Sequence, residues 1–248
     1  MRLRLALASA SLLVLALGAA AEAVGGGPPP VALSVSPARV ALVAPASRTI
    51  ALRNIGTEHV VVEVAPKSLD RSAATTQWLR IRPARLVLRA SSQALVTLRA
   101  GANGLAPPGD HQLVVLLVAR PAGSGRIGVR IRLGVGVRVR MPGRIIRGLV
   151  LRGVRVRRHG PTRDLLVSVA NRGNVTEQLG GRLTVTLARA GRVVSRLRLR
   201  GPRELFPGAH AAVPMRYVGH LRGPATAFVA VRLGGRLRSV ERRYRIRL

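Results

Sequence analysis

The chain has 248 residues and carries 42 Lys and Arg against 9 Asp and Glu, a formal net charge of +33. It contains no cysteine, which excludes a disulfide framework, thiol catalysis and a cysteine-bound metal. Aromatic residues make up 2% of the chain, too few for the stacking surfaces of single-stranded nucleic-acid readers or sugar-binding lectins.

The first segment of the chain predicts export. Met1–Arg4 is short and cationic, Leu5–Ala21 is uncharged and apolar, and Ala21-Glu22-Ala23 has the form of a small-residue cleavage site. This order is typical of a secretory signal peptide. We therefore predict a signal peptide over residues 1–23, a Gly/Pro leader over 24–30, and an extracytoplasmic protein that is secreted or associated with the cell envelope. An uncleaved membrane anchor stays open as the alternative, because about 20 apolar residues span a bilayer.

From residue 31 onward the apolar residues recur with a period of two. Short alternating segments are separated by Gly, Pro, Asn or Asp, the pattern of half-buried antiparallel strands between turns. Amphipathic helices are essentially absent. The strands expected in the first half are Leu33–Leu42, Thr49–Asn54, His59–Val64, Leu79–Leu88, Ala94–Ala100, His111–Ala119 and Ile127–Met141, and those in the second half are Gly148–Arg157, Asp164–Asn171, Arg182–Ala190, Val193–Leu199, Ala211–Val218, Ala225–Leu233 and Ser239–Leu248.

The two halves correspond to each other. An apolar strand that ends in Asn-x-Gly occurs at Asn54 and again at Asn171, and each half ends in a long hairpin. Many short strands with frequent turns are typical of immunoglobulin-like β-sandwiches. We therefore predict an all-β chain of two tandem sandwiches, over residues 31–142 and 143–248. A single β-barrel is the rival, but it gives no reason for the repeated Asn-x-Gly.

The basic residues concentrate on strand faces. Period two places Arg130, Arg132, Arg138 and Arg140 on one face of the strand that ends at Met141, with aliphatic residues on the other. One interpretation is a solvated sheet face in a chain whose Arg content reflects a GC-rich coding sequence. The other is a surface that binds phosphates or carboxylates, because such rows offer bidentate donors. The export signal argues against nucleic acid as the partner.

No pattern in the sequence predicts catalysis or a cofactor. The five histidines are scattered and lack the close spacing of a metal site. Asp110-His111 has no distinctive serine context, and Asp110 is expected to cap a turn. Asn174-Val175-Thr176 matches a glycosylation sequon of low specificity. We predict a non-enzymatic protein with no catalytic residue, no metal ligand and no cofactor.

Several short motifs suggest known families. They are Ser36-Pro37-Ala38-Arg39-Val40, Asn54-x-Gly56, Trp78-Leu79-x-Ile81-x-Pro83 and Pro108-Gly109. Together they resemble the N-terminal, peptidoglycan-associated domain of the WxL-interacting proteins of Gram-positive bacteria. They are also similar to the periplasmic pilus-assembly chaperones, and both families have two immunoglobulin-like domains.

The charge pattern and the resemblances together lead to two expected functions. The first is a structural or binding protein of the cell envelope that contacts anionic wall polymer or surface proteins through its Arg-rich faces, with membrane contact only through an uncleaved signal or through charge. The alternative is an assembly chaperone that binds clients by β-strand addition. The chaperone family implies that basic residues on the first and last strands bind a client carboxylate. Arg39 matches the first position, whereas Val137 falls where that family has Lys, with Arg138 next to it on the opposite face.

Overall fold

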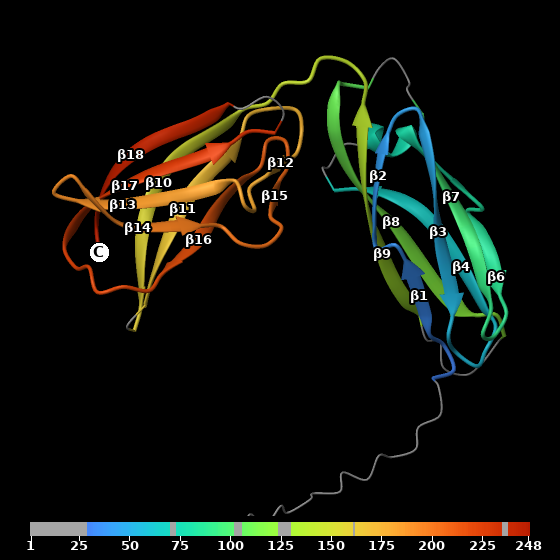
Figure 1. The fold of residues 1–248 in the computed structure, drawn as a ribbon. Helices are drawn as coiled ribbons and strands as arrows, with labels where there is room; N and C mark the ends of the chain where they lie inside the picture. Colours follow the sequence, from blue (N-terminus) through green and yellow to red (C-terminus); the bar gives the residue numbers. More distant parts are fainter. Residues whose placement is uncertain (1–28, 70–72, 102–105, 124–129, 161, 235–237) are drawn as a thin grey trace, which may run out of the picture.

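The structure is a computed structural model, and it describes residues 29–69, 73–101, 106–123, 130–160, 162–234 and 238–248 (Figure 1). The predicted signal peptide and nearly all of the Gly/Pro leader lie outside these residues. Within the described ranges, no helix has the length and apolarity needed to cross a bilayer. The chain forms two β-sandwiches that meet at an angle, which confirms the prediction of two tandem immunoglobulin-like domains.

The N-terminal domain consists of two packed sheets. Its connecting segment η1, a 3₁₀ helix over Ala73–Trp78, precedes the fifth strand. The four-stranded sheet has the order β1 (Leu33–Ser36), β3 (Ala46–Asn54), β7 (Gln93–Ala100), β5 (Leu79–Arg82), and the five-stranded sheet has the order β2 (Arg39–Val43), β9 (Ile131–Met141), β8 (Gly109–Pro121), β4 (Val60–Ser68), β6 (Arg85–Leu88).

The C-terminal domain repeats this construction. It also contains a two-stranded pair on the side that approaches the N-terminal domain (Figure 1). One sheet has the order β10 (Leu149–His159), β11 (Thr162–Asn171), β16 (His210–Tyr217), the other has the order β14 (Arg192–Arg198), β13 (Leu183–Arg189), β17 (Pro224–Arg232), β18 (Ser239–Arg247), and the pair is β12 (Glu177–Gln178) with β15 (Glu204–Leu205).

Each domain has its own core of aliphatic side chains. The first core includes Ile50, Leu98 and Leu117, and the second includes Leu165, Val185 and Val229, all with at most 1% of their surface exposed. Met141 belongs to the first core and Leu149 to the second. Two separate cores explain why the chain forms two sandwiches and not one barrel, because each pair of sheets buries its own apolar faces.

Two of the long segments predicted to form strands each contain two strands, divided at a proline. The segment Leu33–Leu42 contains β1 and β2, which pair with β3 and β9 and so belong to different sheets. The segment Leu79–Leu88 likewise contains β5 and β6. Pro37 and Pro83 lie between these strands, and a proline cannot donate a backbone hydrogen bond to a sheet. The chain therefore changes sheets at these two positions.

The repeated Asn-x-Gly motif has the same structure in both domains. Asn54 is fully buried; its Oδ1 accepts from Gly56 N at 3.0 Å, and its Nδ2 donates to Glu58 O at 2.7 Å and Arg89 O at 3.0 Å. Asn171 is also fully buried, and its amide makes the equivalent bonds to Gly173 N (2.9 Å), Val175 O (2.8 Å) and Leu205 O (2.9 Å). Each asparagine joins the end of a strand to a distant loop. The correspondence predicted from the sequence is therefore present in the hydrogen bonding.

Candidate functional site

Strand β9 has the alternation that the sequence predicts. Val135, Val137 and Val139 are buried in the N-terminal core, whereas Arg132, Arg138 and Arg140 lie on the opposite, outer face. Parallel pairing with β2 places Arg39 opposite Gly136 and Ala41 opposite Arg138. Arg39 therefore shares the outer face with the arginines of β9, as expected for side chains that are paired across neighbouring strands.

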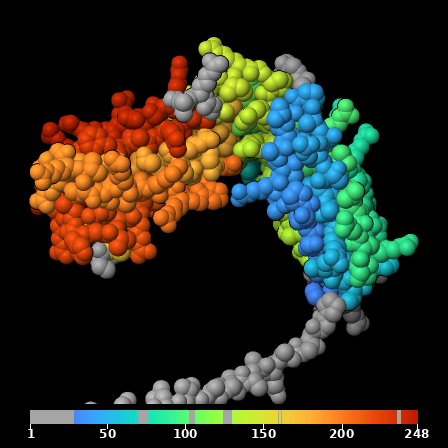
Figure 2. Space-filling view, in the orientation of Figure 1, coloured from blue at the N-terminus to red at the C-terminus, as the bar shows by residue number. Residues whose placement is uncertain are grey.

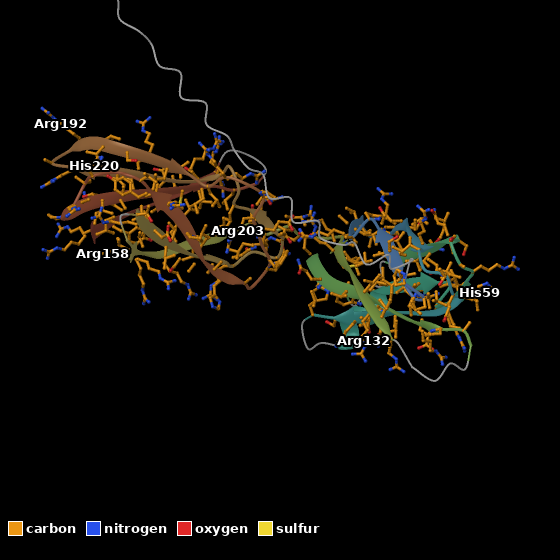
Figure 3. The ribbon with its side chains drawn as sticks, turned by 90° about the horizontal axis from the view of Figure 1, so that it is seen from below. His59, Arg132, Arg158, Arg192, Arg203 and His220 are labelled. Carbon is orange, nitrogen blue, oxygen red and sulfur yellow. The ribbon has the colours of Figure 1, made fainter. Side chains whose placement is uncertain are left out.

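The predicted row of arginines is divided into two groups. Arg130 and Arg132 lie at the end of β9 far from the C-terminal domain, beside a hollow of ≈ 530 Å³ (Figure 3 labels Arg132). The hollow is also lined by Glu63 and Arg120, whose side chains are 3.5 Å apart and about half exposed. Such an exposed pair contributes little free energy. Arg130 and Arg132 have no salt-bridge partner among the described residues.

At the other end of β9, Arg140 is held by an internal carboxylate. Its Nε and Nη2 donate to the two oxygens of Asp110 at 2.6 and 2.9 Å. The Asp110 side chain is fully buried, and its Oδ2 also accepts from Thr176 N of the C-terminal domain at 2.8 Å. Burial raises the pKa of Asp110, but the hydrogen bonds from Arg140 and Thr176 outweigh it and hold that pKa below its ordinary value. Arg140 therefore has a structural role at the contact between the domains, and the expectation that it also binds a ligand stays a prediction.

Further hydrogen bonds fix the two domains to each other. Asn174 Nδ2 donates to Pro108 O at 2.9 Å and to Arg144 O at 2.8 Å, while its Oδ1 accepts from Ile146 N at 2.7 Å. Asp110 N donates to Asn174 O at 2.7 Å. The side-chain amide of the sequon asparagine is thus engaged on both its atoms, which fits an interdomain contact and not a glycosylation site.

A cleft lies between the domains beside Arg39 and Arg138. Figure 2 shows the concave side of the molecule on which the two domains face each other. The cleft has a volume of ≈ 630 Å³, and Arg138 Nη1 forms an ion pair with Glu204 Oε1 across it at 3.1 Å. Arg39 is exposed and has no salt-bridge partner among the described residues. The remaining lining comes from Val40, Ala41, Leu69, Gln112, Leu113, Gly136, Val137, Pro202 and Phe206.

The structure places the second cation of this cleft at Arg138. Val137, at the position where the chaperone family has Lys, has only 2% of its surface exposed and lies in the core. The neighbouring Arg138 projects from the outer face, the face from which Arg39 also projects. Because successive residues of a strand face opposite sides, the Arg138 side chain projects to the cleft, whereas the Val137 side chain packs in the core.

Strand β9 has an open edge next to this cleft. Its pairing with β2 covers only Gly136–Arg140, so the other half, Ile131–Val135, is paired on one side by β8 and has no strand on the other within the described residues. Gly136 N, which donates to Ala38 O at 3.0 Å, marks the start of the covered part. Unpaired backbone groups at a sheet edge are a template for another strand.

The histidines and acids do not assemble into a metal site within the described ranges. No group of three or more His, Cys, Asp or Glu side chains there has the geometry to hold a metal ion. His59 and His220 lie at opposite ends of the molecule (Figure 3). The rings of His111 and the buried Trp78 pack edge to face, with their centroids 4.5 Å apart. The Asp110 carboxylate accepts hydrogen bonds from Arg140 and Thr176. Asp110 is an interdomain contact, and the expectation that it caps a turn is wrong.

Comparison with known proteins supports the fold. No family model and no curated protein matches the sequence. Among solved structures, the Class 5 fimbriae chaperone CfaA is similar with a TM-score of 0.53 at 12% identity, and the alignment covers 86% of this chain and 98% of that one. A chain from a chaperone–tip adhesin complex of CFA/I fimbriae gives a TM-score of 0.52 at 12% identity with the same coverage. The chain therefore has the two-domain fold of these fimbrial chaperones, and the resemblance to WxL-interacting proteins gains no support.

Proposed function

We propose that this protein is a chaperone-like, non-catalytic module that binds an extended segment of a client protein by strand addition. The observation that carries the proposal is the open edge of β9 at Ile131–Val135, which ends where the cleft begins at Arg39. The fold of the fimbrial chaperones agrees with this function. An extracytoplasmic location, expected from the N-terminal segment, is part of the same proposal.

The client strand would pair with the open edge through backbone hydrogen bonds. Added to the five-stranded sheet, it would lie next to β9 on the side that β2 leaves uncovered. Ile131 and Leu133 are partly buried and pack against the N-terminal core, so their outer surfaces are available to the alternate side chains of the client. Main-chain bonds give affinity in this mode of recognition, and the alternate side chains give specificity.

Arg39 would bind the terminal carboxylate of the client. It lies where the open edge meets the cleft, and no described carboxylate pairs with it. Arg138 is the second cation, but it shares its charge with Glu204. An arginine–carboxylate contact is charge-assisted and stronger than a neutral hydrogen bond.

The test uses two synthetic peptides of alternating valine and threonine, one with a free terminal carboxylate and one with a terminal amide. The full chain is expected to bind the free acid about tenfold more tightly than the amide, because a hydrogen bond to a charged group contributes about 1.5–3 kcal/mol. Arg39→Gln should remove this preference. Arg53→Gln, an exposed arginine on the other sheet, is the matched control and should retain it.

Hydrogen exchange locates the peptide. Bound peptide should slow exchange in Ile131–Val135 and leave β6, the opposite edge of the same sheet, unchanged. Equal binding of acid and amide, or protection at β6 and not at β9, contradicts the proposal.

The anionic wall polymer expected from the sequence stays a prediction. Arg130 and Arg132, which lack described ion-pair partners, are the residues of the original row that remain available to such a ligand. Sedimentation of the full chain with purified cell-wall sacculi, and its release by salt, tests that prediction.

A further inference from the structure

The C-terminal domain has a sheet face with an aromatic centre and an arginine border. Strand register places Arg196 of β14 opposite Thr186 of β13, Thr186 opposite Phe228 of β17, and Phe228 opposite Arg243 of β18. One row of side chains therefore crosses all four strands with a cation at each end. Phe228, in the middle of the row, is 45% exposed.

The neighbouring rows extend the same pattern. Ala188 and Thr226 occupy the centre of one adjacent row, which ends at Val193 on β14 and at Arg245 on β18. Thr184 and Ala230 occupy the centre of the other. We call this outer surface the Phe228 face and define it by Arg196, Phe228, Arg243, Arg245 and Arg247 with the small residues between them.

The Phe228 face is strongly cationic at its border. Its one described carboxylate, Glu241, accepts a hydrogen bond from Ser239 Oγ at 3.1 Å. Arg196, Arg243, Arg245 and Arg247 have no salt-bridge partner among the residues that the structure describes. Arg198 is different, because its guanidinium donates twice to Gly181 O, at 2.9 and 2.7 Å. The unpaired arginines favour a partner that brings its own negative charge.

The other described parts of the molecule leave this face open. In Figure 1 the sheet β14-β13-β17-β18 is the near layer of the C-terminal domain, and the N-terminal domain lies beyond its end and not over its face. Figure 2 shows the same surface uncovered in the space-filling view. The face is independent of the open edge of β9, which belongs to the other domain.

The combination of an apolar centre and a cationic border fits an anionic lipid surface. A hydrated polyanion would pair with the arginines and gain little from Phe228. A bilayer offers phosphates to the border and an interfacial layer that an aromatic side chain can enter. The long stems of arginine let their charged ends reach the headgroups while Phe228 inserts between them. We propose that the Phe228 face docks on a membrane surface that contains anionic phospholipids.

Co-sedimentation with vesicles tests the role of the arginines. The full chain is expected to bind vesicles of phosphatidylcholine mixed with phosphatidylglycerol and not to bind vesicles of phosphatidylcholine alone. The triple variant Arg196→Gln/Arg243→Gln/Arg245→Gln should lose about tenfold or more in affinity for the mixed vesicles. The matched control is Arg80→Gln/Arg82→Gln/Arg99→Gln, which removes three exposed arginines from the outer face of the four-stranded N-terminal sheet. Equal losses in the two variants would attribute binding to total charge and overturn the proposal.

A fluorescent variant separates lipid from soluble polyanion. Phe228→Trp places a reporter at the centre of the face, and the wild-type spectrum accounts for Trp78, which is buried in the other domain. The emission should shift to shorter wavelength with mixed vesicles and stay unchanged with sodium polyphosphate. No shift with vesicles that bind the protein would mean that residue 228 does not enter the lipid. The same shift with polyphosphate would identify the face as a site for soluble polyanions. Either result would overturn the membrane proposal.

Discussion

Asp110 connects Arg140 of its own domain to the backbone of Thr176 in the next one. Its two oxygens receive three hydrogen bonds, at 2.6, 2.9 and 2.8 Å, and the carboxylate has no exposed surface. Because Thr176 follows Asn174, whose amide binds the segments around Pro108 and Arg144, this carboxylate lies at the centre of the contact between the domains. The contact joins the two domains that line the cleft beside Arg39.

We expect Asp110→Asn to weaken the interdomain contact. The amide loses the charge that pairs with Arg140 and one of the three acceptor interactions, so the free energy of unfolding should fall by about 1–3 kcal/mol at pH 7. This loss is smaller than for a fully buried ion pair, because the Arg140 side chain is 33% exposed and water screens its charge. Urea unfolding followed by circular dichroism measures the loss.

The loss of stability in Asp110→Asn should depend on pH. The pKa of Asp110 is lower in the folded than in the unfolded chain, so its stabilisation is fully present above the unfolded value of about 3.9 and disappears as pH falls through the folded value. The difference between wild type and Asp110→Asn should therefore be the same at pH 7 and pH 5 and shrink well below pH 4. A difference that shrinks already between pH 7 and pH 5 would contradict this assignment.

Glu204→Gln should strengthen peptide capture. The change removes a negative charge from the cleft and releases Arg138 from its ion pair, so the free-acid peptide should bind roughly threefold to tenfold more tightly. Binding of the amide peptide should not change. Fluorescence anisotropy with labelled peptides measures both, and an unchanged affinity for the acid would show that Arg138 takes no part.

Gly136→Val should block the cleft without unfolding the domain. A Cβ atom at this position would lie 3.8 Å from Arg39 Cγ and 4.0 Å from Ala38 O, both ordinary contact distances. Valine also suits a strand, so stability should change by less than about 1 kcal/mol. Its branched side chain would cover the backbone beside Arg39, and we expect roughly tenfold weaker binding of the free-acid peptide. Full affinity in a folded variant would place the carboxylate elsewhere.

Asn54→Ala and Asn171→Ala should destabilise their domains by similar amounts. Each removes two donors and one acceptor from a fully buried site and leaves the partner backbone groups unpaired. We expect a loss of about 2–4 kcal/mol for each variant in urea unfolding. A loss below about 0.5 kcal/mol in either one would mean that water replaces the amide there.

The periodic parts of the fold could be predicted from the sequence. The alternation in β9 identified Val135, Val137 and Val139 as core residues, and the repeated Asn-x-Gly indicated the duplication that Asn54 and Asn171 display. Both signals are local, because strand period and turn chemistry act over a few residues. Where the sequence prediction joined β1 with β2, it missed that Pro37 moves the chain to another sheet.

The site was less predictable because its contacts join distant segments. Arg138 pairs with Glu204, and Asp110 binds Thr176, each across 66 positions of sequence. The period of a strand carries no information on such contacts. The alternation therefore offered no reason to separate Arg138 and Arg140, which lie near the second domain, from the other two arginines of the row. The single signal for the cleft was the resemblance at Ser36–Val40, which includes Arg39, the unpaired cation of the cleft among the described residues.

Strand β2 covers half of the β9 edge, which limits the length of the partner strand that can pair with the open half. The open half comprises Ile131–Val135, a length of roughly 17 Å for five strand residues. A segment aligned there would meet Arg39 at one end and could not continue past it along the sheet. A client would therefore bind best when its chain ends at Arg39. The open edge would favour terminal segments of proteins over internal strands of equal composition.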